Sequence, residues 1–448
     1  MVVTISNKKE FLILFLGDLT IFVVSLWLTL LVRYQKVPSG ELFLDHLSPF
    51  FIVFLFWTLV FFIAGLYEKH TSILRSRLPG ILLNTQVVNS AIAVFFFYLF
   101  PSFGINPKIN LILYLIISYV LIIFWRVNGL NLFGFRRREK AILIGSGEEM
   151  KELKDEINSN DRYSIKFIAS VDLSNLRSFD FKSEILDKIY SEGVSVAIVD
   201  LRNEKVGPIL PNLYNLIFSN VKFIDMYKVY EDTFDRIPLS LLNYDWFLEN
   251  ISRSVHAGYD ALKRLMDLVI SLALGIASLV FYPIVFLAIK LEDGGPVFIA
   301  QERIGKGNIP FKLIKFRSMK KNDSGIWPTE GDGMITNVGR FLRKTRIDEL
   351  PQLWSVVTGG LSLIGPRPDI IDLGRKLAEE IPYYIARNLI KPGLSGWAQI
   401  KQDIPPHSIE ETKKRLSYDL YYIKNRSLML DLRIALQTIK TLLSRSGR

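Results

Sequence analysis

Residues 338–354 read VGRFLRKTRIDELPQLW and set two adjacent carboxylates, Asp348 and Glu349, directly behind a run of cations. Arg343 and Arg346 lie within a turn or two of these acids. Guanidinium groups keep a nearby carboxyl ionised and bind phosphate oxygens through paired hydrogen bonds. One carboxylate of such a pair can hold Mg²⁺ against phosphates, and the other can attack phosphorus. The stretch therefore predicts a site for a diphosphate.

Short motifs rich in cations, glycine and proline surround this stretch on both sides. They are KFRSM at 315–319, GPRP at 365–368, KPG at 391–393, GWAQ at 396–399 and YD at 418–419. A solvated ion-pair network on a helix is the alternative interpretation of any single arginine and its neighbouring acid. The clustering of several such motifs favours a phosphate-handling site.

An apolar segment, residues 265–289, precedes these motifs and contains a single charge, Asp267. It is long enough to cross a membrane as a helix, in addition to the four apolar stretches of the N-terminal part described next. Such a fifth span would carry the basic C-terminal third of the chain to the outer side of the membrane. Pro283 offers another solution, because proline removes a helix hydrogen bond and kinks or breaks the helix. A helix broken at Pro283 can enter the membrane and return to the same face. We therefore predict a re-entrant membrane helix at 263–291.

Four further apolar stretches lie within residues 1–130, each near the length of about 20 residues that crosses a bilayer as a helix. They are residues 11–31, 47–66, 81–100 and 109–125. Cations gather at Lys8 and Lys9, at Lys69, Arg75 and Arg77, and at Arg126, Arg136, Arg137, Arg138 and Lys140. The positive-inside rule then places both ends of this four-span bundle, and the rest of the chain, in the cytoplasm.

Asp18 lies inside the first apolar stretch, where a carboxyl is costly and can mark a function. The alternative is a neutral or paired residue that faces the third stretch, which is unusually polar because it contains Asn84, Gln86 and Asn89. We favour this second interpretation.

The composition supports a membrane protein. Half of the residues are hydrophobic and the mean hydropathy is +0.26. The absence of cysteine excludes disulfides, thiolate chemistry and zinc sites built on Cys. The net charge of +11 fits either a nucleic acid or a membrane surface with anionic lipids or phosphates. The apolar stretches favour the membrane, so no nucleic-acid partner is expected.

Strands and helices alternate between residues 140 and 255, which is typical of a parallel, Rossmann-like sheet. Strands are predicted at 141–144, 165–171, 194–199 and 221–223. The first strand leads into Gly145-Ser146-Gly147, but a dinucleotide fingerprint needs a third glycine where Met150 stands. Glu148 and Glu149 would also repel a pyrophosphate at this helix start. A regulatory or dimerising domain is the favoured interpretation, and nucleotide binding is the alternative.

Seven motifs of the C-terminal part closely resemble the bacterial sugar transferase family, whose members are polyprenyl-phosphate hexose-1-phosphate transferases, also called monotopic phosphoglycosyl transferases. In chain order they are KRLMD, GGPVFIAQERIG, PFKLIKFRSM, VGRFLRKTRIDELPQLW, LSLIGPRP, KPGLSGWAQ and YDLYYIKNRSLMLDLRIALQTI, and they cover nearly all of residues 262–443. The bundle and the Rossmann-like domain look like the large form of the family. The predicted fold is thus a membrane α-helical bundle of four spans (1–130), a Rossmann-like α/β domain (140–255), and a mostly α-helical α/β catalytic domain (258–448) with the re-entrant membrane helix.

The resemblance implies an enzyme of the bacterial inner membrane whose catalytic domain lies on the cytoplasmic face. Asp348 would attack the sugar-bearing phosphorus of a UDP-sugar and expel UMP. Polyprenyl phosphate, typically undecaprenyl phosphate, would then take the sugar phosphate from the aspartate. This reaction would be the first membrane step of exopolysaccharide, O-antigen or glycoconjugate synthesis.

The resemblance also implies roles for single residues. Glu349 would bind the Mg²⁺ cofactor, and Arg343 and Arg367 match family arginines that hold phosphate. Further substrate-binding candidates are Lys315, Arg317, Gln399 and Asp419, and the helix break falls at Pro283. Arg346 stands where Ser is usual in the family, and Thr358-Gly359-Gly360-Leu361 replaces the usual Lys-Gly-Asp-Met. The carboxylate pair is unchanged, so these departures concern the sugar and the nucleotide contacts rather than the reaction. The sequence does not identify the sugar, and glucose, galactose and an N-acetylated amino sugar fit equally well.

Two other functions are compatible with parts of the sequence. A membrane-bound, NAD-dependent nucleotide-sugar dehydratase or epimerase needs a Tyr-x-x-x-Lys pair, and only Tyr259 and Lys263 have that spacing. A non-catalytic scaffold that recruits sugar enzymes is the second alternative. Residues 427–444 are amphipathic and either lie on the membrane surface or pack against the catalytic domain. The middle domain is compatible with a homodimer.

Overall fold

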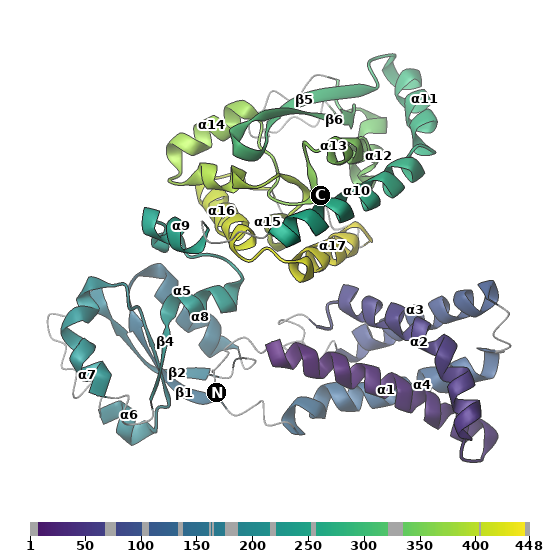
Figure 1. Cartoon of the computed structure of the whole chain (residues 1–448), viewed down its shortest axis with the longest axis horizontal. Helices are drawn as coiled ribbons and strands as arrows, with labels where there is room; N and C mark the ends of the chain where they lie inside the picture. Colours follow the sequence, from purple (N-terminus) through teal and green to yellow (C-terminus); the bar gives the residue numbers. More distant parts are fainter. Residues whose placement is uncertain are drawn as a thin grey trace. The chain divides into compact units, whose positions relative to one another are not determined.

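The structure, a computed structural model (Figure 1), describes residues 8–67, 78–100, 107–132, 138–160, 163, 165–174, 187–215, 221–251, 257–320, 335–402 and 405–443. The chain forms two compact units, Met1–Thr233 and Phe234–Arg448. Five of the cations on which the predicted orientation depends lie outside the described residues, namely Lys69, Arg75, Arg77, Arg136 and Arg137.

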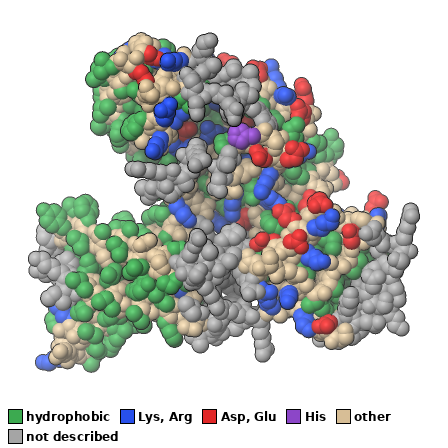
Figure 2. All heavy atoms as spheres, turned by 180° about the vertical axis from the view of Figure 1, so that it is seen from behind, with side chains coloured by type: hydrophobic (Ala, Val, Ile, Leu, Met, Phe, Trp, Pro, Cys, Tyr) green, Lys and Arg blue, Asp and Glu red, His purple; other side chains and the backbone are tan. Residues whose placement is uncertain are grey.

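The first unit begins with a bundle of apolar helices. In the described part these are α1 (Lys8–Tyr34), α2 (Gly40–Ile63), α3 (Leu78–Leu99) and α4 (Pro107–Leu132). In the core of the bundle Phe22 stacks on Phe54 and meets Trp57 edge-on, while the surface of the bundle is also largely hydrophobic (Figure 2). Helices that are apolar all round are buried in lipid or protein. Three of them, α1 to α3, are long and apolar enough to cross a membrane, which confirms a membrane protein, whereas the apolar part of α4, Leu111–Arg126, is shorter. The fourth span stays a prediction.

Asp18 is buried and paired, as predicted, but the predicted partner was wrong. It forms an ion pair with Arg126 of α4 rather than facing α3, and the hydroxyl of Tyr67 donates to it at 2.8 Å. Arg126 also donates to the carbonyl of Leu66 at 2.6 Å. Arg126 was expected among the cations that follow the span. Because α4 continues to Leu132, Arg126 lies inside the helix and reaches the carboxylate.

A four-stranded parallel sheet of order β2-β1-β3-β4 follows in the first unit. Its strands are β1 (Glu139–Gly145), β2 (Ile165–Asp172), β3 (Val196–Val199) and β4 (Lys222–Asp225), and the segments between and after them form α5 (Gly147–Ser159), α6 (Asp187–Glu192), η5 (Glu204–Ile209), α7 (Leu210–Asn215) and α8 (Met226–Phe234). Most side chains of β1 and all of β3 are buried, as in parallel sheets covered on both faces. The predicted parallel sheet is confirmed, and its assignment as Rossmann-like stays a prediction.

The glycine that ends β1 and the glycine that starts α5 both have structural reasons. A Cβ at Gly145 would lie 2.7 Å from the sulfur of Met226, so glycine leaves room for this side chain of α8 at the end of β1. Gly147 has a φ of +85°, which favours glycine. Asn203 donates to the Ser146 hydroxyl at 2.8 Å. These contacts account for the two glycines through the packing of the domain.

The second unit starts before the predicted catalytic domain. Residues 234–251, which were predicted to belong to the middle domain, add η7 (Leu239–Leu241) and α9 (Tyr244–Asn250) to it. Ile237 and Trp246 are buried in one core with Leu377 and Leu416. Residues 252–256, next to the predicted domain boundary, lie outside the described part of the chain.

The rest of the second unit is mostly helical, with two small two-stranded sheets. Its helices are α10 (Ala257–Ser278), α11 (Phe281–Asp293), α12 (Asn337–Thr345), α13 (Gln352–Thr358), α14 (Ile371–Glu380), α15 (Trp397–Lys401), α16 (Ile409–Lys424) and α17 (Leu428–Leu443), with 3₁₀ turns η8 (Lys306–Asn308), η10 (Ile347–Glu349) and η11 (Tyr384–Leu389). The antiparallel hairpin pairs β5 (Phe298–Ile304) with β6 (Pro310–Phe316), and the parallel pair joins β7 (Ser362–Ile364) to β8 (Gly393–Ser395).

The apolar segment forms α10 and α11, which meet at an angle of 53°. The break falls at Leu279 and Val280, a turn before Pro283. This position has a physical reason, because the proline ring clashes with the carbonyl four residues earlier, that of Leu279, whereas Pro283 itself lies in the first turn of α11. Val269 and Ile284 are more than half exposed, so the pair presents an apolar face.

The C-terminal helix α17 packs against the second unit. Ile434 and Leu436 are buried, and Asp431 is buried as well. Met429 and Leu432 remain exposed on the other face. The predicted packing of this segment is therefore observed, and its contact with a membrane surface stays a prediction.

Candidate active site

The carboxylate pair lies in a tight turn after the short helix α12. The helix begins at a cap, where the Thr336 hydroxyl accepts from the N–H of Gly339 at 2.9 Å, and it ends at Thr345 with Arg346 as its C-cap. Arg346 has a φ of 55°, in the left-handed region that few non-glycine residues adopt. This residue turns the chain into η10, which presents Asp348 and Glu349 in succession and lies against β6.

Asp348 is the buried member of the pair, with 8% of its surface exposed. Burial raises the pKa of its carboxyl to about 6, and the negative charge of Glu349 adds to the rise. Lys315 and Arg343 are close enough for their positive charges to act in the opposite direction. At neutral pH most of this carboxyl is therefore ionised although it is poorly solvated, a state suited to nucleophilic attack on an electrophile.

Glu349 is more exposed and faces two guanidinium groups. Arg346 lies 3.6 Å from one carboxylate oxygen, and Arg367 lies 3.7 Å from the other. Exposed ion pairs of this length contribute little to stability. The Arg367 side chain is 47% exposed, so an incoming anion can replace Glu349 as its ion-pair partner. The fold thus brings Lys315, Arg343 and Arg367, from three separate motifs, to the predicted carboxylates.

Arg343 is held by the KFRSM motif. Its Nε donates to the hydroxyl of Ser318 at 3.0 Å, and another of its nitrogens lies 3.0 Å from the sulfur of Met319. Sequence reasoning did not single out Ser318, although it stands beside the two cations that were selected. Its position next to Arg317 in the KFRSM motif is the sequence feature by which it could have been selected.

Arg317, a predicted substrate residue, is buried in an ion pair with Asp293 at the end of α11. Its guanidinium covers Gly295 so closely that any side chain there would collide with it. The neighbouring Glu292 accepts from the backbone N–H of Asn337 at 2.6 Å and so caps α12. The end of the apolar helix pair therefore holds both β6 and α12 in place, and a direct role of Arg317 toward substrate stays a prediction.

Gln399 lies on α15, beside the place where the loops at Gly365 and Gly396 cross. Its Oε1 is buried and has no hydrogen-bond partner among the described residues. A Cβ at Gly396 would lie 3.2 Å from this oxygen. A buried acceptor carries a desolvation cost unless a water or a ligand donates to it. This state is compatible with the predicted contact to substrate.

Asp419, the remaining candidate, is buried on α16 and accepts from the Nε of Arg387 at 3.0 Å. Arg387 also forms an ion pair with Asp369 and donates to the carbonyl of Arg367 at 2.8 Å. Sequence reasoning missed Arg387, because its acidic partners are 18 and 32 positions away and no motif marks it. A contact of Asp419 with substrate stays a prediction.

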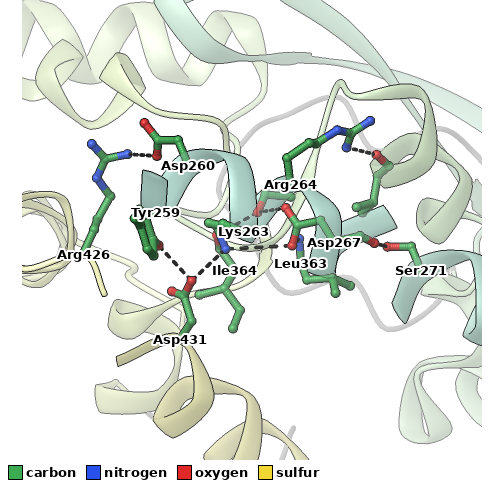
Figure 3. A network of polar contacts seen from close by, with 12 residues as sticks. Tyr259, Asp260, Lys263, Arg264, Asp267, Ser271, Leu363, Ile364, Arg426 and Asp431 are labelled. Atoms are coloured by element: carbon green, nitrogen blue, oxygen red, sulfur yellow. Dashed lines mark hydrogen bonds and ion pairs between the residues drawn. The ribbon is translucent and has the colours of Figure 1, made fainter. Parts of the chain in front are cut away.

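A buried polar network fixes α10 to the second unit (Figure 3). Tyr259 and Lys263 point toward Asp431 of α17, at 2.8 Å and 3.0 Å. Asp267, the only charge of the apolar segment, accepts from the hydroxyl of Ser362 at 2.7 Å. The Tyr-x-x-x-Lys spacing on which the dehydratase alternative depended is thus part of this network, and the structure lends that alternative no support.

A divalent cation fits the carboxylate pair. The mutual repulsion of Asp348 and Glu349 would be relieved by a positive ion, and the Glu349 side chain is 25% exposed. In the part of the chain that the structure describes, no three His, Asp or Glu residues gather as metal ligands. The protein would then supply one or two carboxylates and the substrate phosphates would supply further oxygens, an arrangement common for Mg²⁺.

Comparison with known proteins places this site in a family. Residues 258–445 match the family model for bacterial sugar transferases. The UDP-N-acetylgalactosamine-undecaprenyl-phosphate N-acetylgalactosaminephosphotransferase of Aeromonas hydrophila is 43% identical over 195 residues, which are 42% of this chain and 45% of that protein. The UDP-glucose:undecaprenyl-phosphate glucose-1-phosphate transferase of Caulobacter vibrioides is 38% identical, over 41% of this chain and 71% of that protein. The undecaprenyl-phosphate glucose phosphotransferase of Komagataeibacter xylinus is 30% identical over 68% of this chain and 59% of that protein.

The apolar helices define a membrane protein, and the described C-terminal residues hold a buried carboxylate close to two cations. The chain belongs to the bacterial sugar transferase family. The matched region spans less than half of the Aeromonas relative.

Proposed function

We propose that this chain transfers a sugar 1-phosphate from a UDP-sugar to undecaprenyl phosphate and releases UMP. Its relatives in Aeromonas and Caulobacter carry names that describe such transfers. The observation that carries the proposal is the buried carboxylate of Asp348, which lies beside Glu349 and under the influence of Lys315 and Arg343.

In the first half-reaction an oxygen of Asp348 bonds to the sugar-bearing phosphorus of the UDP-sugar. The bond from this phosphorus to the oxygen bridging the two phosphates breaks, and UMP leaves with that oxygen and its electron pair. A sugar-phosphoryl aspartate remains. Lys315, Arg343 and Arg367 lie where they can neutralise the charge that develops on the phosphate oxygens, which is the main contribution of a protein to phosphoryl transfer.

In the second half-reaction an oxygen of undecaprenyl phosphate bonds to the same phosphorus and displaces the Asp348 carboxylate. The product is a lipid diphosphate sugar, and the enzyme returns to its starting state. We propose Mg²⁺ as the cofactor, with Glu349 as its protein ligand. When bound, the ion would neutralise diphosphate charge beside the nucleophile.

We further propose four membrane spans, a cytoplasmic catalytic unit in the bacterial inner membrane, and a re-entrant α10–α11 pair. The bend of 53° and the exposed apolar side chains of the pair support the proposal that this pair is re-entrant. The chain has no native cysteine, so single cysteines at the exposed positions Leu262 and Leu291 are unique probes. We expect both to react only from the cytoplasmic side, whereas labelling of position 291 from outside would show a broken span.

The test of the reaction is a screen of UMP release. Purified protein in nanodiscs is given single UDP-sugars with and without undecaprenyl phosphate, and Asp348→Asn serves as the control. We expect at least one donor to give sustained UMP release with the lipid and a single burst without it. Failure of every UDP-sugar to yield lipid-linked product would reject the proposal.

We also propose that the parallel α/β domain regulates or dimerises the enzyme. Sedimentation of a variant without residues 140–233, compared with the full-length protein, tests whether this domain is needed for a dimer.

A further inference from the structure

We infer that Arg387 is a positioning residue, which holds the loop of Arg367 so that the Arg367 guanidinium meets the diphosphate beside Glu349. The inference rests on the proposed function, because it assigns a task within the same reaction. It concerns a residue that lies outside the carboxylate pair and its cations.

The loop at residues 365–369 is fastened through its backbone. The N–H of Gly365 donates to the carbonyl of Ser395 at 2.8 Å, which anchors the start of the loop to β8. Arg303 donates to a carbonyl near its end, that of Pro368, at 3.2 Å. Prolines on both sides of Arg367 restrict the backbone further. The loop is therefore a rigid support whose position decides where the Arg367 side chain begins.

Arg387 makes the contact to Arg367 itself. One of its terminal nitrogens donates to the Arg367 carbonyl at 2.8 Å. The same guanidinium forms ion pairs with Asp369, which also belongs to the loop, and with Asp419 on α16. Arg387 therefore contacts the loop at residue 367 and again at residue 369. A planar guanidinium with five donors can make these contacts at once, which a lysine ammonium cannot.

The carboxylates on either side fix the plane of this guanidinium. Burial alone would raise the pKa of Asp369, but Arg387 and Arg415 lower it to about 2, so Asp369 stays charged at neutral pH. Arg387 is only 2% exposed, and its N–H groups donate to acceptors within the protein. It therefore does not reach the substrate itself, and its hydrogen bond to the Arg367 carbonyl is the contact that this proposal concerns.

Arg415 provides a matched control within the same network. It also forms an ion pair with Asp369, at 3.1 Å, and its guanidinium lies beside the hydroxyl of Tyr384. Its described hydrogen bonds do not include the Arg367 carbonyl. A change at Arg415 thus disturbs the network without removing the contact that defines the proposal.

The experiment is a double-mutant cycle between Arg387→Lys and Arg367→Ala in the full-length protein in nanodiscs. The readout is the rate of the UMP burst with a saturating UDP-sugar and no lipid. We expect Arg387→Lys to slow the burst about 10- to 100-fold, because displacement of a positioned group by about 1 Å has effects of this size. In the Arg367→Ala background the same change should cost less than about 3-fold, and Arg415→Lys should cost less than about 3-fold in the wild type.

Thermal unfolding of each variant shows which ones are folded. If Arg387→Lys does not fold, Asp369→Asn takes its place in the cycle, since it removes a charged partner of Arg387 and leaves Arg387 present. Equal, additive losses in both backgrounds, or an equal loss in Arg415→Lys, would overturn the inference and leave a network that only stabilises the fold. Absence of any burst in the wild-type protein would count against the proposed function instead.

Discussion

Replacing Gly365 by alanine should displace the loop that carries Arg367. A Cβ at this position would lie 2.5 Å from the carbonyl oxygen of Lys391 and 3.0 Å from the backbone nitrogen of Gly393. Ordinary contact begins at about 3.4 Å, so one of the two segments must move by roughly 0.9 Å. Both neighbours are backbone atoms, one at the start of β8 and one two residues before it, so no side chain can rotate away to relieve the clash.

This displacement has two measurable consequences. Overpacking of a close contact costs about 1–3 kcal/mol, so the melting temperature should fall by a few degrees. A shift of about 1 Å in a positioned group lowers the rate of reaction about 100-fold, so UMP release should fall by one to two orders of magnitude. Both quantities are measured on the same nanodisc preparation, by thermal unfolding and by a UMP assay.

Gly258→Ala is the matched control, because no atom lies within 4 Å of the added Cβ and the glycine lies in the first turn of α10 in the same unit. It should leave turnover unchanged. If Gly365→Ala keeps turnover within about 2-fold of the wild type, the position of this loop does not govern the reaction. The proposed link from Arg367 to the diphosphate would then be refuted.

The remaining predictions concern two buried carboxyls. In protein freed of divalent ions the pKa of Asp348 should be about 6, so the carboxylate becomes protonated and stops acting as a nucleophile as the pH falls below this value. Glu349→Gln should lower this pKa, because it removes a negative charge beside Asp348. Infrared difference spectra against Asp348→Asn measure it, and an unchanged pKa in Glu349→Gln would show that the charge of Glu349 does not contribute to the rise. In the bundle, Asp18→Ala should destabilise by about 3–5 kcal/mol, because it leaves the Arg126 charge buried. Joint replacement of both residues by leucine should cost less, and detergent-induced unfolding that ranks the variants in the opposite order would speak against this pair.

Local patterns were sufficient to predict a large part of the fold. The parallel strands were found because buried strands read as short apolar runs, and the helices of the bundle were found by length and apolarity. The site could be predicted where its residues are adjacent in sequence. Asp348, Glu349 and Arg343 belong to one continuous stretch, so their proximity follows from a single helix and turn.

Contacts between segments that are distant in the chain could not be predicted from the sequence. Nothing local pairs Asp18 with Arg126, and the two are 108 positions apart. The break between α10 and α11 was placed at Pro283, but the steric conflict of a proline acts on the preceding turn, at Leu279. Arg387 was missed for the same reason as the partner of Asp18, because a buried ion pair is a property of packing rather than of spacing.

A bond between the Asp348 carboxylate and phosphorus is the central claim, and it can be observed directly. The protein is incubated with a UDP-sugar alone, quenched in acid and digested with trypsin, which cuts after Arg346 and releases a peptide that begins at Ile347. Fragmentation in a mass spectrometer should then locate a sugar-phosphate adduct on Asp348, and the adduct should disappear when undecaprenyl phosphate is added before the quench. Lipid-linked product formed at the normal rate without any adduct on Asp348 would contradict this claim.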